Sequence, residues 1–242
     1  MKISAKTDVG LVRKNNQDFF LAGELQDGVT WAVVCDGMGG ASGGNIASEV
    51  AATMISEKLS SGFHPGMNDN SIKHLIISAV EAANASVFSK AKADESLEGM
   101  GTTAVIVMIK EDTMYLAHVG DSRIYVVSED SINQLTTDHS VVQMMIDNGE
   151  ITPEEAKTHP KKNIITRALG VEDSVRIDYD QEIFNEGDTV LLCTDGLTNF
   201  VSDNDILNIC RENDSYSFTD KLVEAALKNG GGDNVTVVAV SD

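Results

Sequence analysis

Short apolar runs alternate with polar, glycine-containing segments along much of the chain. Six runs are rich in β-branched residues and bounded by Gly, Asp or Asn, a pattern typical of β-strands. They cover residues 31–35, 103–109, 114–119, 123–127, 189–194 and 234–240. Only residues 120–122 separate the third run from the fourth, so the sequence predicts a β-hairpin there.

Three other segments carry apolar residues three or four positions apart, as amphipathic helices do. They span residues 46–59, 72–87 and 218–226. Two helices in succession, followed by clustered strands, disfavour a repeating βαβ sheet and predict an α+β fold with helices covering antiparallel sheets. Since no repeat or linker divides the sequence, we expect a single domain over residues 1–242.

Residues 140–165 form a polar insertion with helical character. Gly149 indicates that one helix ends near this residue. The segment TPEE at 152–155 predicts a capping box that begins another helix, with Pro153 at its first position. Insertions of this size commonly form lids or binding loops, so we expect a flap here.

The chain carries 38 acidic and 18 basic residues, a formal net charge of −20. A surface this acidic repels the phosphates of nucleic acids and anionic lipids, so neither nucleic acid nor membrane is an expected partner. The three cysteines form no metal-binding pair and suit a reducing compartment. With no signal peptide and no stretch approaching ~18 apolar residues, we expect a cytoplasmic location.

Four aspartates, each beside or near a glycine, stand where apolar runs begin or end. They are Asp36, Asp121, Asp195 and Asp233. Two carboxylates about 4 Å apart repel by roughly 4 kcal/mol at an effective dielectric near 20, so a cluster needs raised pKa values or a shared cation. Oxygen ligands suit hard ions such as Mg²⁺ or Mn²⁺. A single Asp-Gly pair usually forms a turn, and periodicity alone leaves open whether the four converge.

Eight short motifs follow one another over essentially the whole chain. They are TDVGLVRKNNQD at 7–18, DGMGG at 36–40, GTT at 101–103, HVGDSR at 118–123, LTTDHS at 135–140, ITRALG at 165–170, TDGL at 194–197 and GDNVT at 232–236. In this order they resemble the type 2C (metal-dependent, PPM) serine/threonine protein phosphatases in their compact bacterial form. No single motif is diagnostic, but the ordered set is very specific.

The resemblance implies a four-layer αββα sandwich, with two antiparallel sheets flanked by helices and a metal channel at one edge. It implies that Asp36 bridges two ions and that the Gly37 carbonyl binds one of them. Asp195 and Asp233 are expected to hold the other ion. Asp121 matches an acid that, with Asp195, completes a weaker third site.

Further roles follow from the same resemblance. Asp18 and Asn234 are expected to orient the metal ligands without binding directly. Arg13 is expected to bind the phosphate oxygens through the parallel N–H donors of its planar guanidinium. The implied reaction is hydrolysis of phosphoserine and phosphothreonine in proteins by a metal-bridged hydroxide, without a phosphoenzyme, using Mn²⁺ or Mg²⁺. The implied partners are phosphorylated proteins, including a bacterial Ser/Thr kinase and its substrates, and we expect a monomer.

Two positions depart from the family pattern. Many relatives carry histidine, a candidate general acid, where this chain has Met38. We therefore assign no general acid. Gln17 stands where many members have glutamate, which predicts one fewer charge near the bridging ion and weaker affinity there.

Four other polar residues are interpreted as structural. His118 and His139 stand near motif ends, where histidine is more often hydrogen-bonded packing than a metal ligand. Arg123 and Arg167 are interpreted as ion-pair partners rather than substrate contacts.

Two other functions remain as alternatives. The segment GASGG at 40–44 fits the nucleophile elbow of a serine hydrolase, with Ser42 as nucleophile. The predicted strand ends too early for that elbow, and no histidine follows His159 to complete a triad. A non-catalytic phosphoprotein-binding module is the second alternative. It predicts the loss of a metal ligand, whereas all the expected aspartates are present.

Overall fold

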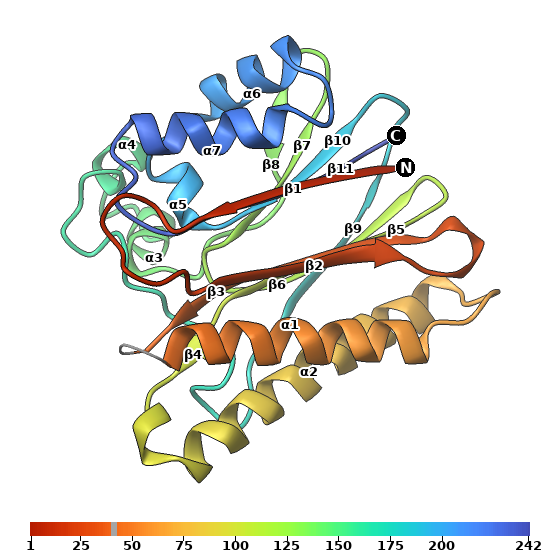
Figure 1. The fold of residues 1–242 in the computed structure, drawn as a ribbon, viewed down its shortest axis with the longest axis horizontal. Helices are drawn as coiled ribbons and strands as arrows, with labels where there is room; N and C mark the ends of the chain where they lie inside the picture. Colours follow the sequence, from red (N-terminus) through yellow and green to blue (C-terminus); the bar gives the residue numbers. More distant parts are fainter. Residues whose placement is uncertain (40–42) are drawn as a thin grey trace.

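The structure of the protein, a computed structural model, describes residues 1–39 and 43–242. Two antiparallel β-sheets pack face to face, and helices cover the outer face of each (Figure 1). This arrangement confirms the predicted αββα sandwich.

The first sheet has the strand order β1-β11-β10-β7-β8. Its strands are β1 (Lys2–Asp8), β7 (Arg123–Val127), β8 (Ile132–Gln134), β10 (Thr189–Cys193) and β11 (Val235–Ser241). The second sheet has the order β2-β3-β5-β6-β9, and the short β4 pairs with the end of β3. Its strands are β2 (Asp18–Glu24), β3 (Thr30–Met38), β4 (Gly101–Thr102), β5 (Ala104–Lys110), β6 (Thr113–Val119) and β9 (Asp178–Ile183).

The helices form two groups and a flap. The second sheet is covered by α1 (Gly43–Gly62) and α2 (Asp69–Ala93). The first sheet is covered by α5 (Asp195–Thr198), α6 (Asp203–Glu212) and α7 (Phe218–Lys228). The helices α3 (Val141–Asp147) and α4 (Pro153–Ala156) belong to the flap, and the 3-10 turns η1 (Gln26–Gly28) and η2 (Glu95–Leu97) lie in connections.

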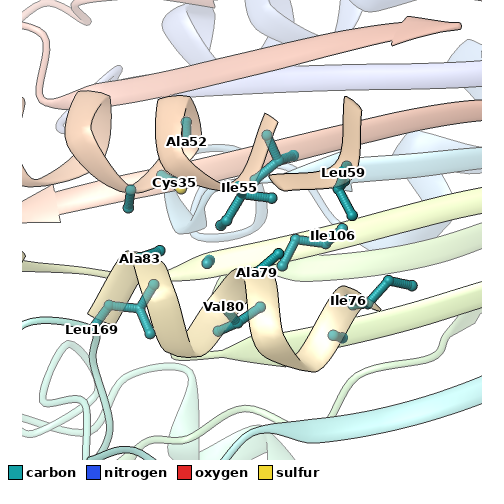
Figure 2. Packing of buried hydrophobic residues seen from close by; sticks show 14 of the residues in the cluster. Cys35, Ala52, Ile55, Leu59, Ile76, Ala79, Val80, Ala83, Ile106 and Leu169 are labelled. Atoms are coloured by element: carbon teal, nitrogen blue, oxygen red, sulfur yellow. The ribbon is translucent and has the colours of Figure 1, made fainter. Parts of the chain in front are cut away.

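The central strands are buried on both faces, which explains why they read as continuous apolar runs. In β3, Val33 and Cys35 pack against α1 and α2, whereas Ala32 and Val34 pack between the two sheets. Figure 2 shows the helix side of this core, where Ile55 and other side chains of both helices meet the sheet. A third apolar layer lies between the first sheet and α5–α7.

The predicted hairpin between residues 114–119 and 123–127 is wrong. Strand β6 pairs with β5 and β9 in the second sheet, whereas β7 pairs with β10 and β8 in the first. The link at 120–122 instead carries the chain across the gap of about 10 Å between packed sheets. Gly120 permits this crossing because its φ is +109°, a conformation that other residues rarely adopt.

The flap has the predicted local structure. Its two ends meet in an antiparallel bridge between Ser140 and Ile165. The capping box at Thr152 and Glu155 is present, with the Thr152 backbone N–H donating to Glu155 Oε2 at 2.8 Å. Gly149 has a φ of +72° just beyond α3. The insertion therefore leaves and rejoins the body at a single point.

Within the part of the chain that the structure describes, no helix combines the length and the apolar character needed to cross a bilayer.

Candidate metal centre

The predicted aspartates come from segments that end or begin at one end of the sandwich, near α3, α5 and β4 in Figure 1. Asp36 lies near the end of β3, and Asp195 opens α5 directly after β10. Asp121 lies in the crossing after β6, and Asp233 stands two residues before β11. The topology therefore brings together acids that lie up to about two hundred residues apart in the sequence.

The charges of these acids act on one another. Burial raises the pKa of Asp36 well above its usual value, and repulsion from Asp18, Asp195, Asp121 and Asp233 adds to the shift. Burial, with repulsion from Asp195, raises the pKa of Asp121 to about 7. Burial, with repulsion from Asp233, raises the pKa of Asp195 to about 6. These carboxylates form one electrostatic cluster.

Asp18 lies directly opposite Asp36 in the β2–β3 register and joins the two sheets. Its Oδ2 accepts hydrogen bonds from the hydroxyls of Thr194, at 2.9 Å, and Thr236, at 2.7 Å. Its Oδ1 is buried and has no hydrogen-bond partner among the described residues. Burial raises the pKa of Asp18 to about 7. Since Thr194 precedes Asp195, Asp18 also fixes the backbone that presents that acid.

Asn234 holds the loop that carries Arg13. Its Oδ1 accepts from the Gln17 backbone N–H at 2.8 Å, and its Nδ2 donates to the carbonyls of Val9, at 2.9 Å, and Asn15, at 3.0 Å. Both ends of the loop are thus tied to the start of β11. All these contacts are with the backbone, so Asn234 supports the site from behind.

Arg13 reaches the cluster from this loop. Its Nη2 donates to Asp233 Oδ2 at 2.8 Å, and this bond raises the pKa of the guanidinium. About half of the side chain, 52%, stays exposed. Arg13 is the only ion-pair partner that any of the five clustered carboxylates has within the described ranges.

Two glycines allow the backbone to close around the cluster. A Cβ on Gly37 would lie 2.0 Å from the carbonyl oxygen of Gly44, at the start of α1. A Cβ on Gly196 would lie 1.8 Å from the carbonyl oxygen of Asn234. Neither position accommodates a side chain, so both motifs require glycine for close packing rather than for a turn alone.

The flap borders the cluster across a cleft of about 740 Å³, whose lining includes Asp121 and Asp195. Lys162 of the flap donates to Asn199 Oδ1 at 3.3 Å, and Asn199 in turn donates to Asp195 Oδ2 at 2.9 Å. The flap is therefore connected by hydrogen bonds to a predicted metal ligand. A basic side chain also faces this side of the acidic cleft.

A second group of polar side chains lies beside the flap root. The potential ligand atoms of His118, His139 and Asp178 all lie within 4.8 Å of one another. The histidine rings stack at 4.5 Å, and His118 Nε2 donates to the Thr137 carbonyl at 2.9 Å. The sequence interpretation of both histidines as hydrogen-bonded packing residues agrees with these contacts.

The protonation of His139 follows from its partners. The Gly120 backbone N–H donates to Nδ1 at 3.0 Å, so in the neutral ring the proton is on Nε2, which donates to Asp178 at 3.2 Å. Burial, with the neighbouring His118, lowers the pKa of His139 to about 4 and keeps it neutral. The sequence did not predict which partners His139 has, because they are a backbone group and a carboxylate distant in sequence.

The two arginines interpreted as structural do form ion pairs. Arg123 binds Asp138 in a bidentate manner, at 2.9 and 2.7 Å. Arg167 Nη1 lies 2.8 Å from Asp178 Oδ1. Arg123 stands two residues after Asp121, so its pair with Asp138 stiffens the start of β7.

The residues present fit a centre for hard divalent cations. The predicted set offers carboxylate oxygens and one carbonyl, which is the donor chemistry that Mg²⁺ and Mn²⁺ prefer. The raised pKa values show that negative charge accumulates there with Arg13 as its sole ion-pair partner within the described ranges. Oδ1 of Asp18, which is buried without a hydrogen-bond partner among the described residues, could accept a hydrogen bond from metal-coordinated water. The fold and the cluster together define a two-sheet protein with a cation site at one end of the sandwich.

Comparison with known proteins agrees with this description. The sequence profile of the family described as Protein phosphatase 2C matches residues 12–234. Protein phosphatase PhpP of Streptococcus pneumoniae is 38% identical over 242 residues, covering 100% of this chain and 97% of the relative. The chain belongs to the protein phosphatase 2C family. It is accordingly a metal-dependent serine/threonine protein phosphatase.

Solved structures show the same fold. Serine/threonine phosphatase Stp1 from Staphylococcus aureus superposes with a TM-score of 0.94 at 33% identity, covering 100% of this chain and 94% of that chain. The catalytic domain of the serine/threonine protein phosphatase PstP, in complex with two manganese ions, has a TM-score of 0.86 at 34% identity, covering 100% and 98%. Ser42, the nucleophile of the serine-hydrolase alternative, lies outside the described residues.

Proposed function

We propose that the aspartate cluster is the catalytic metal centre and that Arg13 is its phosphate-binding residue. In this proposal Asp36 and the Gly37 carbonyl would hold one cation, Mn²⁺ or Mg²⁺, and Asp36, Asp195 and Asp233 would hold a second. Asp121, together with Asp195, would hold a third cation more weakly. The observation that carries the proposal is the convergence of these acids, since burial raises the pKa of Asp36 and repulsion from Asp18, Asp195, Asp121 and Asp233 raises it further.

The bound cations would neutralise the phosphate dianion and lower the pKa of coordinated water, which supplies a nucleophile at neutral pH. Arg13 supplies two parallel N–H donors to phosphate oxygens, a geometry that lysine cannot reproduce. In the present structure one of these donors binds Asp233, so the guanidinium already lies beside the cluster. Asn234 fixes the loop behind it, and Asp18 fixes the backbone before Asp195.

Leaving-group protonation is not assigned to any side chain here. Met38 occupies the position after the Asp36–Gly37 pair and has no proton to give. The thioether instead packs towards Gly101. The departing alkoxide would therefore take its proton from water in the site or from another group.

The substrate chemistry suggests the biological setting. Phosphoserine and phosphothreonine in proteins are products of a protein kinase, so we infer that the chain opposes a bacterial Ser/Thr kinase. The net charge of −20 disfavours self-association, which supports a monomer. Free thiols at Cys35, Cys193 and Cys210 suit the reducing cytoplasm that we propose as its location.

Phosphate release from a phosphothreonine peptide tests the proposal. We expect release with Mn²⁺, none with EDTA, and a loss of about 100-fold or more for Asp36→Asn, since the bridging carboxylate would be gone. Asp220→Asn on α7 is a matched control, because Asp220 is an exposed aspartate paired with Lys6. Full activity in EDTA would contradict a metal centre. Full activity of Asp36→Asn would contradict the assignment of Asp36.

A further inference from the structure

A cavity of about 280 Å³ adjoins the metal centre on the side of Met38, two residues beyond Asp36. Half of its lining is apolar, and most of it comes from the segment that follows the flap. The lining residues are Met38, Ile165, Thr166, Arg167, Ala168, Val171, Glu172, Ser174, Val175 and Arg176. None of these residues belongs to the proposed ligand set.

The segment that lines most of the cavity is joined to the backbone of Asp36 through Thr102. The Thr102 hydroxyl donates to the Asp36 carbonyl at 2.8 Å. Thr102 also pairs with Leu169 through two backbone hydrogen bonds, at 3.1 and 2.8 Å. Leu169 is fully buried and packs beside Ala83 of α2, as Figure 2 shows. The cavity therefore lies one strand away from the reaction centre.

The loop that forms one wall of the cavity is held in place by Asn84, a buried residue of α2. Asn84 Oδ1 accepts from the Gly170 N–H at 2.8 Å. Its Nδ2 donates to the carbonyls of Glu172, at 3.1 Å, and Asp173, at 3.2 Å. Both the oxygen and the nitrogen of this amide thus hydrogen-bond to the backbone of the loop. The wall is pre-formed rather than shaped by a ligand.

The floor of the cavity is apolar. Met38 Cε and Val171 Cγ2 lie 2.8 and 3.0 Å from the position that a Cβ on Gly101 would take, so both side chains converge over that glycine. Val171 is 50% exposed, although it is one of the more costly side chains to leave in water. An apolar surface of this kind inside a built cavity is typical of a ligand subsite.

The charged groups around the cavity balance one another. Arg167 is paired with Asp178 at 2.8 Å, and Arg176 contacts the same carboxylate through Nε at 3.5 Å. Glu172 adds a negative charge to the lining. The cavity therefore carries no excess positive charge to recruit an anion. Its chemistry favours an uncharged, apolar occupant.

We propose that this cavity is a specificity subsite that receives an apolar side chain of the phosphoprotein substrate, close in sequence to the phosphorylated residue. The inference rests on the proposed function, because it takes Asp36 as part of the reaction centre. A protein whose phosphate lies at the cluster must extend its chain over the adjoining surface, and Met38, which lines this cavity, lies on the same strand as Asp36 and two residues beyond it. The side chain of Arg176 is 78% exposed and can donate to a substrate carbonyl at the rim.

A set of phosphothreonine peptides tests the proposal. A Leu, an Ala or a Glu is placed in turn at each of the three positions on either side of the phosphothreonine, in an otherwise alanine background. At one position or more, kcat/KM for Leu should exceed that for Ala by about ten-fold, within the range that one apolar side chain contributes in a pocket. Val171→Ser should reduce this ratio to about three or less, because the floor loses its methyl groups.

Two controls separate the subsite from the reaction centre. The kcat/KM of the all-alanine phosphothreonine peptide, which places no large apolar side chain in the cavity, normalises the comparison between Val171→Ser and the unmodified protein. Ile183→Ser is the matched variant, since Ile183 is a β-branched residue on strand β9 that is 69% exposed. It should leave the Leu-to-Ala ratio unchanged.

Several results would overturn the subsite. One is equal kcat/KM for Leu and Ala at all six positions, and another is a preference for Glu, which would indicate an anion site at Arg176. Equal losses for Leu and Ala peptides in Val171→Ser would assign Val171 a structural role only. Failure of the proposed function looks different, because the alanine peptide itself would then release no phosphate with Mn²⁺, and the subsite would fall with it.

Discussion

The guanidinium of Arg13 lies 2.8 Å from the carboxylate of Asp233, although the two residues are separated by 220 positions in the sequence. The loop of Arg13 is held there by Asn234, the neighbour of Asp233. One short segment before β11 therefore positions both a metal ligand and the phosphate-binding residue. A substitution of either Arg13 or Asp233 should therefore alter the position and charge environment of the other side chain.

Arg13→Ala should lower kcat/KM for a phosphothreonine peptide by about 100-fold, the effect expected when a donor to the developing phosphate charge is lost. Arg13→Lys should recover only a minor part of the lost kcat/KM, because an ammonium group cannot form the two parallel hydrogen bonds that a planar guanidinium forms with phosphate. Lys14→Ala, at the exposed neighbouring position, serves as the control. Equal activity of the Lys and Arg proteins would contradict a bidentate role.

Asp18→Asn should weaken the binding of Mn²⁺ by about 10- to 100-fold while leaving the fold intact. The amide has nearly the shape of the carboxylate and its oxygen can still accept from Thr194 and Thr236, as Oδ2 does, but it lacks the negative charge. Titration calorimetry with Mn²⁺ measures the change. An unchanged affinity would show that Asp18 only joins the sheets.

The metal-free protein should lose stability as the pH rises from 4 to 7. Asp36, Asp121 and Asp195 have raised pKa values in the folded state, about 7 and 6 for the last two, against about 4 in the unfolded chain. In this window the folded state binds more protons than the unfolded state, so the free energy of unfolding falls with rising pH.

Thermal denaturation with EDTA and with Mg²⁺ checks this sign. Since the ion compensates the ionised cluster, the increase in Tm on adding Mg²⁺ should grow between pH 5 and pH 8. A metal-dependent increase that shrinks over this range would mean that these carboxylates do not bind the ion.

His139→Ala should destabilise the protein by about 1–3 kcal/mol, because it leaves the buried N–H of Gly120 without an acceptor. His139→Asn should recover part of the loss, since its side-chain oxygen can take the place of Nδ1. Urea unfolding of the three proteins measures the difference. Equal stability of the Ala and Asn proteins would show that the contact with Gly120 contributes little.

The sequence predicts the central, buried strands of this fold well. Strands such as β3 and β5 are apolar on both faces, so they stand out whatever their neighbours are. The edge strands β1, β2 and β9 carry polar or charged residues and were not predicted, because only their pairing partners make them strands. The wrong hairpin at Gly120 has a similar cause. Local sequence gives the length of a link but not the sheet in which the next strand pairs.

The candidate site was likewise predicted in part. Aspartates at strand ends are visible in the sequence, and their motifs give the expected roles. The arrangement around them depends on contacts between distant segments, as in the bond from Thr236 to Asp18 and the clamp of His139 on Gly120. No periodicity or spacing signals such contacts.

Anomalous diffraction from crystals grown with Mn²⁺ is the most direct test of the metal centre. Two strong peaks should lie among the oxygens of Asp36, Asp195 and Asp233, at about 2.2 Å from their ligands. Peaks between His118, His139 and Asp178 instead, or none near Asp36 at saturating Mn²⁺, would contradict the assignment.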